Sequence, residues 1–384
     1  MTTNKKNIMV LSGKRGGFGA MKQMLRSINR NIKMNLQLVL TDQHTDQRFG
    51  NTYKEVQKEF KKIDKIFMYQ KNDLAINRIA ALVKFQSSFS KLIKKRKPNL
   101  LILYGDRSEV LAASLVANNM LIPVAHIQGG DISGTLDEHF RHAITKLSHL
   151  HFPSILSSYK RIIKLGEKPK NVFVVGDSHL DQIYEKDYYT REKTNKILKL
   201  EKNKKIIVIL QHSVGNEYKN SFQQMRITLD SIKKFDAQKI IIYPCSDIGY
   251  KGIIKAINLF KHNPDITVYK NLDAPLFLGL LKISNLLIGN SSCGIIESSL
   301  LKIPVINIGT RQKNRPHAEN VIQCKHDKKA IIKAIKKSLN SKKFISKVQN
   351  SKNIYGDGKT GLKIVKILSK IKNFDELFEK RISY

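Results

Sequence analysis

Short apolar runs alternate along the chain with longer stretches in which apolar residues recur every three or four positions. The short runs suit strands that are buried on both faces of a parallel sheet, and the longer stretches suit amphipathic helices. A first set of expected strands is Ile8–Leu11, Leu36–Leu40, Lys65–Tyr69, Leu100–Tyr104, Pro123–Ile127, His151–Ile155 and Val172–Val175. A second set is Ile206–Leu210, Ile240–Tyr243, Ile266–Tyr269, Leu286–Ile288 and Val305–Ile308. This alternation predicts the α/β class, with two doubly wound sheets in tandem.

A polar stretch, Glu185–Lys205, separates the two sets of strands and carries few apolar residues. Domain boundaries fall in such stretches, so we expect one domain over residues 1–185 and a second over 186–360. Residues 361–384 form a closing segment, with helical patterns at Gly361–Lys372 and Phe374–Ser383.

The segment Gly129–His142 is the most distinctive part of the chain. It follows an apolar run and contains three carboxylates, two imidazoles and one guanidinium. Open α/β sheets bind ligands at the carboxyl ends of their strands, which is where this segment is expected to lie. The mixture therefore predicts a functional site.

Gly105–Glu109 also follows an expected strand and precedes an expected helix. One interpretation makes Asp106 or Ser108 a helix cap. Arg107 needs a further reason, because a cation beside a helix N-terminus opposes the helix dipole unless an anion lies between them.

Two strand ends of the second half offer groups that bind anions. Gly289–Gly294 supplies glycines and serines at an expected helix start, which favours a phosphate site over capping alone. Asn307–Arg315 supplies cations that either clamp a diphosphate or form a solvated basic loop.

Two further segments give weaker signals. In the first half, Gly13–Gly19 resembles a nucleotide loop only weakly. In the second half, His212 follows the first expected strand.

The chain has 384 residues and a formal net charge of +38. The lysines are spread over nearly every expected helix, whereas nucleic-acid binding surfaces cluster basic residues and interleave aromatic ones. The charge thus favours an anionic small ligand and makes a nucleic-acid partner a remote alternative. Without an apolar membrane span or a secretory signal, and with three scattered cysteines, the sequence predicts a cytoplasmic protein. His139, His142, His149 and His151 lack the pattern of a metal site, and we expect no metal.

The motifs together resemble the hydrolysing UDP-N-acetylglucosamine 2-epimerases. The likeness runs from the first strand to Gly358, and the block Arg141–His149 (RHAITKLSH) followed by the block Gly289–Gly294 (GNSSCG) is highly specific. The other matching segments are Gly105–Arg107, Gly129–Asp131, Ser133–Gly134, Asp137–Glu138, Gly309–Gln312 and Glu319–Asn320.

The resemblance implies a glycosyltransferase-B-like fold with two Rossmann-like domains, a sugar nucleotide in a central cleft, and closing helices that pack on the first domain. It implies a reaction that needs no cofactor, in which UDP-N-acetylglucosamine and water give UDP and N-acetylmannosamine for sialic-type acids. Close relatives act on a 2,4-diacetamido sugar nucleotide on the route to legionaminic acid. The C2 proton leaves as UDP departs from C1, and water then adds to the resulting 2-acetamidoglucal. It also implies a homo-oligomer, a dimer or a tetramer.

Carried over to this chain, the resemblance makes Asp106, Asp131, Asp137 and Glu138 the acid and base candidates. It makes His212 a residue that either contacts the diphosphate or assists its departure. The substrate and UDP contacts it implies are Arg15, Arg107, Gln128, Arg141, His142, His212, Ser291, Ser292, Gly294, Glu297 and Arg311, with Glu297 suited to the ribose hydroxyls.

Three positions depart from the family pattern. Family members often have Arg-Ala-Asp-Tyr where this chain has Arg15–Phe18, so an acidic group is absent. Gln128 replaces a carboxylate that some members place before the paired glycines, and Cys245 replaces an asparagine. These departures concern the nucleotide base and the sugar more than the type of reaction.

Three alternatives stay open. A glycosyltransferase of the same fold would need an acceptor, and a non-hydrolysing epimerase would keep UDP on the sugar. The third is a basic protein that binds nucleic acid or anionic surfaces without turning over a substrate.

Overall fold

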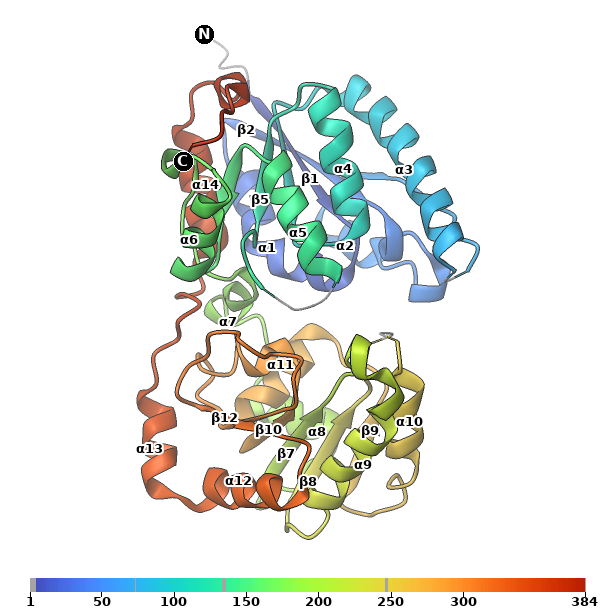
Figure 1. Ribbon diagram of the computed structural model, residues 1–384, viewed down its shortest axis with the longest axis vertical. Helices are drawn as coiled ribbons and strands as arrows, with labels where there is room; N and C mark the ends of the chain where they lie inside the picture. Colours follow the sequence, from blue (N-terminus) through green and yellow to red (C-terminus); the bar gives the residue numbers. More distant parts are fainter. Residues whose placement is uncertain (1–4, 73, 133–135, 246–247, 384) are drawn as a thin grey trace. The chain divides into compact units, whose positions relative to one another are not determined.

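The computed structural model describes residues 5–72, 74–132, 136–245 and 248–383. The chain forms two compact units (Figure 1). Unit 1 consists of Met1–Gln182 together with Tyr355–Tyr384, and unit 2 consists of Ile183–Ile354. The domain limits expected at 185 and 360 lie a few residues from these positions.

Unit 1 contains a six-stranded sheet in the order β3-β2-β1-β4-β5-β6, and every neighbouring pair is parallel. Its strands are β1 (Lys6–Ser12), β2 (Met34–Leu40), β3 (Ile63–Lys65), β4 (Leu100–Tyr104), β5 (Val124–Ile127) and β6 (Leu150–Phe152). This is the order of a doubly wound nucleotide-binding fold, in which all strand carboxyl ends meet at one edge.

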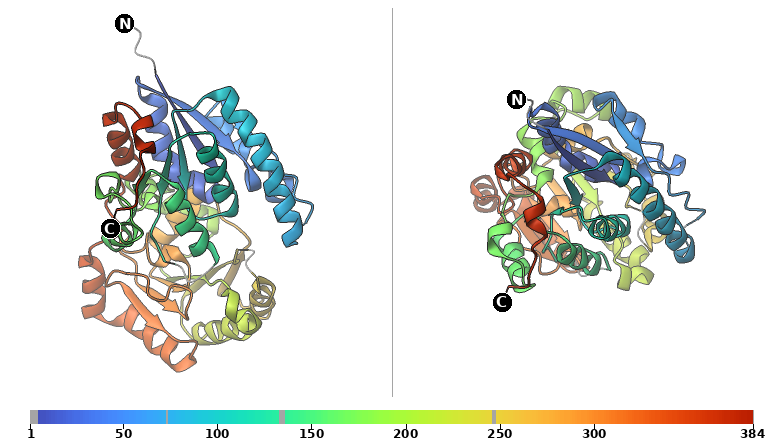
Figure 2. Two further views of the ribbon diagram at one scale, coloured as in Figure 1. Left: turned by 45° about the horizontal axis from the view of Figure 1, so that its top comes forward. Right: turned by 90° about the horizontal axis from the view of Figure 1, so that it is seen from above.

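Helices cover both faces of this sheet (Figure 2). On one face α1 (Arg15–Arg30) and α14 (Thr360–Lys370) pack on the strands, and on the other α3 (Ala75–Arg96) and α4 (Ser108–Asn119) do so. A Cβ at Gly361 would lie 2.5 Å from the Met24 nitrogen, so the contact between α1 and α14 requires glycine there. The remaining helices of unit 1 are α2 (Tyr53–Glu59), α5 (Leu136–Leu147), α6 (Leu156–Lys164) and α7 (Asp181–Tyr184), which extends into unit 2.

Unit 2 repeats the same sheet order, β12-β11-β10-β7-β8-β9, again with parallel neighbours. Its strands are β7 (Ile206–Leu210), β8 (Gln238–Ile242), β9 (Ile266–Tyr269), β10 (Leu286–Gly289), β11 (Val305–Ile308) and β12 (Val321–Cys324). Its helices are α8 (Arg191–Leu198), α9 (Ser221–Ile232), α10 (Tyr250–Asn258), α11 (Ala274–Ile283), α12 (Lys328–Asn340) and α13 (Lys342–Asn350). The prediction of two doubly wound parallel sheets in tandem is confirmed.

Several predicted elements differ in detail. The run Lys65–Tyr69 contributes only its first residue to β3, and β12 was not predicted at all. Val172–Val175 runs beside β6 but forms a single bridge, from Val172 to His151, because Pro153 has no N–H with which to continue the ladder. Phe374–Ser383 contains only a short 3₁₀ helix, Asp375–Phe378. The helix expected after Gly289 is instead a 3₁₀ turn, Ser292–Gly294, followed by further turns.

Candidate active site

The carboxyl edge of the unit 1 sheet collects the polar segments that the sequence singled out. The loop after β1 carries Gly13, the loop after β2 carries Asp42, and the loops after β4 and β5 carry Asp106 and Asp131. Because all six strands are parallel, these loops emerge on the same side of the sheet.

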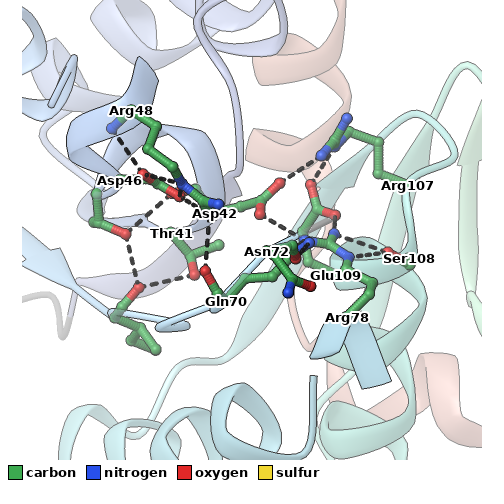
Figure 3. Close-up of polar contacts among 12 residues, drawn as sticks. Thr41, Asp42, Asp46, Arg48, Gln70, Asn72, Arg78, Arg107, Ser108 and Glu109 are labelled. Carbon is green, nitrogen blue, oxygen red and sulfur yellow. Dashed lines mark hydrogen bonds and ion pairs between the residues drawn. The ribbon is translucent and has the colours of Figure 1, made fainter. Parts of the chain in front are cut away.

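Two arginines and two carboxylates form a closed ring of ion pairs at this edge (Figure 3). Arg78 contacts Asp42 and Glu109 at 2.6 Å each. Arg107 contacts Glu109 at 2.5 Å through Nε, and it also pairs with Asp42. Each carboxylate therefore bridges the same two guanidinium groups.

The ring explains how a cation is tolerated at the start of α4. Arg107 is the N-cap residue of that helix, and Glu109 in its first turn is fully buried. Burial alone would lower the pKa of Arg107, but the charges of Glu109 and Asp42 raise it above its ordinary value. The sequence analysis expected an anion beside Arg107, and the carboxylates of Glu109 and Asp42 supply it. Gly13 must be a glycine, because a Cβ there would lie 2.3 Å from Glu109 Oε1.

Arg141 joins two of the predicted acid and base candidates. This α5 residue forms an ion pair with Asp106, and its Nη1 donates to the Asp131 carbonyl at 2.8 Å. Asp131 is buried, and its Oδ1 accepts a hydrogen bond from the Ser158 hydroxyl at 2.5 Å. Asp106, Asp131 and Arg141 therefore form one cluster, as the sequence predicted for residues at neighbouring strand ends.

The charges of Asp106 and Arg141 influence the pKa of Asp137. Burial raises the pKa of Asp137, and the negative charge of Asp106 raises it further, while Lys14, Arg141 and Arg107 oppose the shift. A carboxylate with a raised pKa near a second carboxylate is a common arrangement for acid and base chemistry.

Glu138 and His142 form a pair one helical turn apart on α5. Glu138 Oε1 lies 3.7 Å from His142 Nε2. Burial lowers the pKa of His142 although Glu138 opposes the shift, so the imidazole is favoured in its neutral form. Ser133, Gly134 and Thr135 of the same motif lie outside the described residues.

Gln128 has a left-handed backbone, with φ of 64°, which is unusual for a residue other than glycine. Its Nε2 donates to Asp177 Oδ2 at 2.7 Å. Asp177 is fully buried and was not among the predicted site residues. The available signal was its position in Gly176–His179, a glycine and polar group after an apolar run.

The second half of the RHAITKLSH motif has structural contacts instead. The Thr145 hydroxyl lies 3.1 Å from His126 Nδ1, and Lys146 Nζ lies 2.8 Å from Glu167 Oε1. His149 Nδ1 accepts from the Val124 N–H at 3.1 Å. Only the Arg141–His142 end of this motif joins the candidate site.

Asn290 connects three strand ends at the carboxyl edge of unit 2. Its side chain binds the backbone of His212 twice: Oδ1 accepts from the His212 N–H at 2.7 Å, and Nδ2 donates to the His212 carbonyl at 2.9 Å. Its carbonyl accepts from Arg311 Nη1 at 3.3 Å and Gln312 Nε2 at 3.0 Å. Asn290 is almost fully buried and was missed as a site residue, although the Gly-Asn-Ser-Ser run contained it.

Several of the predicted anion-binding residues of unit 2 follow this asparagine in the sequence. Ser291 precedes the 3₁₀ turn that contains Ser292 and Gly294, and Glu297 is buried three residues beyond Gly294. The backbone N–H of Cys245 donates to His212 Nδ1 at 3.2 Å, so position 245 holds the imidazole without an asparagine side chain. Arg15 of unit 1, in contrast, pairs with exposed Glu55.

Comparison with known proteins gives a consistent result. The family described as UDP-N-acetylglucosamine 2-epimerase matches residues 26–369. A UDP-N,N'-diacetylbacillosamine 2-epimerase (hydrolyzing) from Legionella pneumophila is 32% identical over 99% of this chain and 100% of its own length. A UDP-N-acetylglucosamine 2-epimerase from Neisseria meningitidis is 31% identical over 88% of this chain and 89% of its own length.

The solved structures that resemble this chain establish its fold. A crystal structure of UDP-GlcNAc 2-epimerase from Neisseria meningitidis bound to UDP-GlcNAc has a TM-score of 0.81 at 19% identity, covering 95% of this chain and 100% of that one. A glycosyltransferase from Rickettsia africae has a TM-score of 0.59 at 14% identity, covering 98% of this chain and 100% of that one. The predicted glycosyltransferase-B-like fold is confirmed. No helix among the described residues is both long and apolar enough to span a membrane.

Proposed function

Because the chain belongs to the UDP-N-acetylglucosamine 2-epimerase family, we propose that it is a hydrolysing 2-epimerase of a UDP-linked 2-acetamido sugar. The enzyme releases UDP and a free sugar with inverted configuration at C2. The main structural support is the cluster of Asp106, Arg141 and Asp131, together with Asp137, whose pKa is raised by burial and by the charge of Asp106. Removing a proton from one face of C2 and returning one to the other face requires at least two such groups.

The first candidate substrate is UDP-N,N'-diacetylbacillosamine, a 2,4-diacetamido sugar nucleotide. It is favoured because the relative that covers this chain from end to end carries that name. UDP-N-acetylglucosamine, which the sequence motifs favoured, is the second candidate, supported by the Neisseria meningitidis relative. The two substrates differ at C4 and C6 of the sugar but undergo the same reaction at C1 and C2.

In the first half of the proposed reaction, a base takes the C2 proton while the bond from C1 to the UDP oxygen breaks. The electron pair of the C2–H bond forms the C1=C2 double bond, and UDP leaves with the electrons of its own bond. In the second half, water adds its oxygen to C1 and an acid delivers a proton to C2 from the opposite face. Asp106, which forms an ion pair with Arg141, suits the base, and Asp137, with its raised pKa, suits the acid.

The departing diphosphate develops negative charge, which prearranged donors stabilise. We assign this role in unit 2 to His212, Ser291, Ser292 and the backbone at Gly294, with Arg311 as a cation and Glu297 for the ribose hydroxyls. In unit 1 we assign it to Arg15 and to Arg107, whose guanidinium also pairs with Asp42 and Glu109. Gln128 and His142 remain proposed contacts of the substrate, and Asp131 and Glu138 remain candidates for the acid or the base. Assembly into a homodimer or homotetramer remains a prediction that light scattering tests.

The deciding experiment is incubation with each sugar nucleotide in the absence of an acceptor. We expect free UDP and the free 2-epimeric sugar in equal amounts, identified by mass spectrometry and NMR. UDP that stays attached to the epimerised sugar would indicate a non-hydrolysing epimerase, and turnover only with an added acceptor would indicate a glycosyltransferase. Intact substrate together with salt-dependent retention on duplex DNA would favour the basic binding protein.

A further inference from the structure

A buried carboxylate at the carboxyl edge of unit 1 has no role in the chemistry described so far. Asp177 has no exposed surface, and its two oxygens are shared among several donors. Oδ2 accepts from Gln128 Nε2 at 2.7 Å, and Oδ1 accepts from the His179 backbone N–H at 3.0 Å. Burying a carboxylate is unfavourable unless such donors compensate its charge.

The imidazole of His179 is held by the same carboxylate. Its Nδ1 lies 2.9 Å from Asp177 Oδ1 and 3.2 Å from the Tyr104 hydroxyl. A carboxylate accepts hydrogen bonds when it is ionised, so this contact favours the neutral imidazole tautomer that carries its proton on Nδ1 and its lone pair on Nε2. About a third of the His179 side chain (35%) is exposed, which makes this base accessible.

Capping alone does not explain this arrangement. The Asp177 side chain caps a short 3₁₀ helix, Ser178–Leu180, through the His179 N–H. A cap needs one oxygen and one backbone donor, whereas Asp177 also binds an imidazole and a glutamine amide. Gln128 is held in its left-handed backbone conformation beside this carboxylate, and such strained residues occur preferentially at functional sites.

The partners of this pair come from the two strand ends that also deliver the acidic cluster. Tyr104 is the last residue of β4, two positions before Asp106, and Gln128 follows β5, three positions before Asp131. The Tyr104 and His179 rings contact each other with centroids 6.1 Å apart. The carboxylate–imidazole pair therefore belongs to the same edge of the sheet as Asp106 and Asp131.

We propose that His179 is the general base that activates water in the second half of the proposed reaction, and that Asp177 is its positioning residue. His179 Nε2 takes one proton from water, the water oxygen bonds to C1, and the electron pair of the C1=C2 bond takes a proton at C2 from Asp137. The imidazolium that forms is stabilised by Asp177, as in other carboxylate–imidazole pairs that activate an oxygen nucleophile. This inference rests on the proposed function.

The test is a His179→Gln variant assayed separately for UDP release and for the free hydrated sugar. Loss of the base for water should slow hydration by about a hundredfold or more and leave elimination working. The unsaturated 2-acetamido sugar should then appear with UDP in the NMR spectrum, and the wild-type protein should release none. His262→Gln is the matched control, because His262 is exposed in unit 2 just before β9, and its products should equal those of the wild type.

A second variant and a spectroscopic measurement keep the outcome interpretable. Asp177→Asn should also release the unsaturated sugar, because the imidazole loses the acceptor that orients it. In the ¹⁵N spectrum of the full-length wild-type protein, the His179 ring should be the Nδ1–H tautomer. Thermal unfolding of each variant shows whether it is folded, and a folded His179→Gln protein suffices for the test.

Three results would overturn the proposal while the proposed function stands. The first is a folded His179→Gln protein with the product ratios of the wild type, and the second is a variant in which UDP release and sugar release fall equally without the unsaturated product. The third is a proton on Nε2 of His179 in the wild-type protein. Failure of the wild-type protein to release UDP from either sugar nucleotide would instead overturn the proposed function and this inference together.

Discussion

The carboxyl edges of the two sheets have the same strand order but opposite chemistry. In unit 1 the edge is built from ion pairs, in which Asp42, Glu109 and Asp106 contact arginines. In unit 2 the edge is organised by a neutral amide, Asn290, that holds His212 through hydrogen bonds. The residues that follow each strand, rather than the fold, therefore decide what each edge can do. In the proposed reaction, unit 1 supplies the groups that transfer protons, and unit 2 supplies most of the proposed contacts of the phosphorylated leaving group.

The largest expected effect is on the ring of ion pairs in unit 1. Glu109→Gln leaves Arg78 and Arg107 with one carboxylate fewer in a buried position, and we expect a loss of about 3–5 kcal/mol in the free energy of unfolding. Urea titration measures this loss. The control is Glu55→Gln, which breaks the exposed pair with Arg15 and should change the same quantity by about 1 kcal/mol or less. If both variants lose the same free energy of unfolding, the ring stabilises the protein no more than an exposed ion pair does.

The next effect separates chemistry from binding. Asp137→Asn should lower turnover about a hundredfold or more while the Kd for UDP changes little, because this carboxylate is proposed to act on the sugar carbon. Steady-state kinetics and calorimetry measure the two quantities. Glu201→Gln, an exposed position in unit 2, should match the wild type in both. Turnover at the wild-type rate in Asp137→Asn would remove that residue from the mechanism.

A smaller effect is expected from the corresponding change in unit 2. Asn290→Ala removes both hydrogen bonds that fix the His212 backbone, so we expect UDP to bind about tenfold more weakly, in line with about 1–1.5 kcal/mol for such bonds. Calorimetry with UDP alone makes this comparison. If UDP affinity is unchanged in folded Asn290→Ala protein, Asn290 does not organise a binding edge.

The smallest effect concerns the pKa of Asp137. The charge of Asp106 helps to raise that pKa, so Asp106→Asn should shift it toward lower pH by less than the full elevation, since burial is the larger cause. Proton donation by Asp137 is lost as the pH rises through its pKa, and the variant should lose it at lower pH. A ¹³C titration of the Asp137 carboxyl measures the shift, and an unchanged or higher pKa would contradict the assigned proximity.

The parts of the fold that depend on apolar patterning were predictable. Ten of the strands were expected with small errors at their ends, because buried parallel strands are uninterrupted apolar runs. The pattern failed where packing or proline decides the outcome. Val172–Val175 has the composition of a strand, but Pro153 prevents its neighbour from completing the ladder.

The candidate site was predictable one strand end at a time. Asp106, Asp131 and Arg141 were each placed at a strand end or helix start, and they do meet. The ring of ion pairs around Arg107 was not predictable, because Asp42, Arg78 and Glu109 are far apart in sequence and become neighbours only when α3, α4 and the end of β2 pack together. Asp177 was missed although it follows the expected strand Val172–Val175, because its contact with Gln128 arises only when the chain folds.

The most direct test of the proposed chemistry is turnover of UDP-N,N'-diacetylbacillosamine and UDP-N-acetylglucosamine in D₂O. Removal of the C2 proton and its replacement from solvent predict a free sugar that carries one deuterium at C2, with one UDP released for each sugar, from at least one of the two substrates. A free sugar that retains its original hydrogen at C2 would contradict the account, and so would a product that still carries UDP.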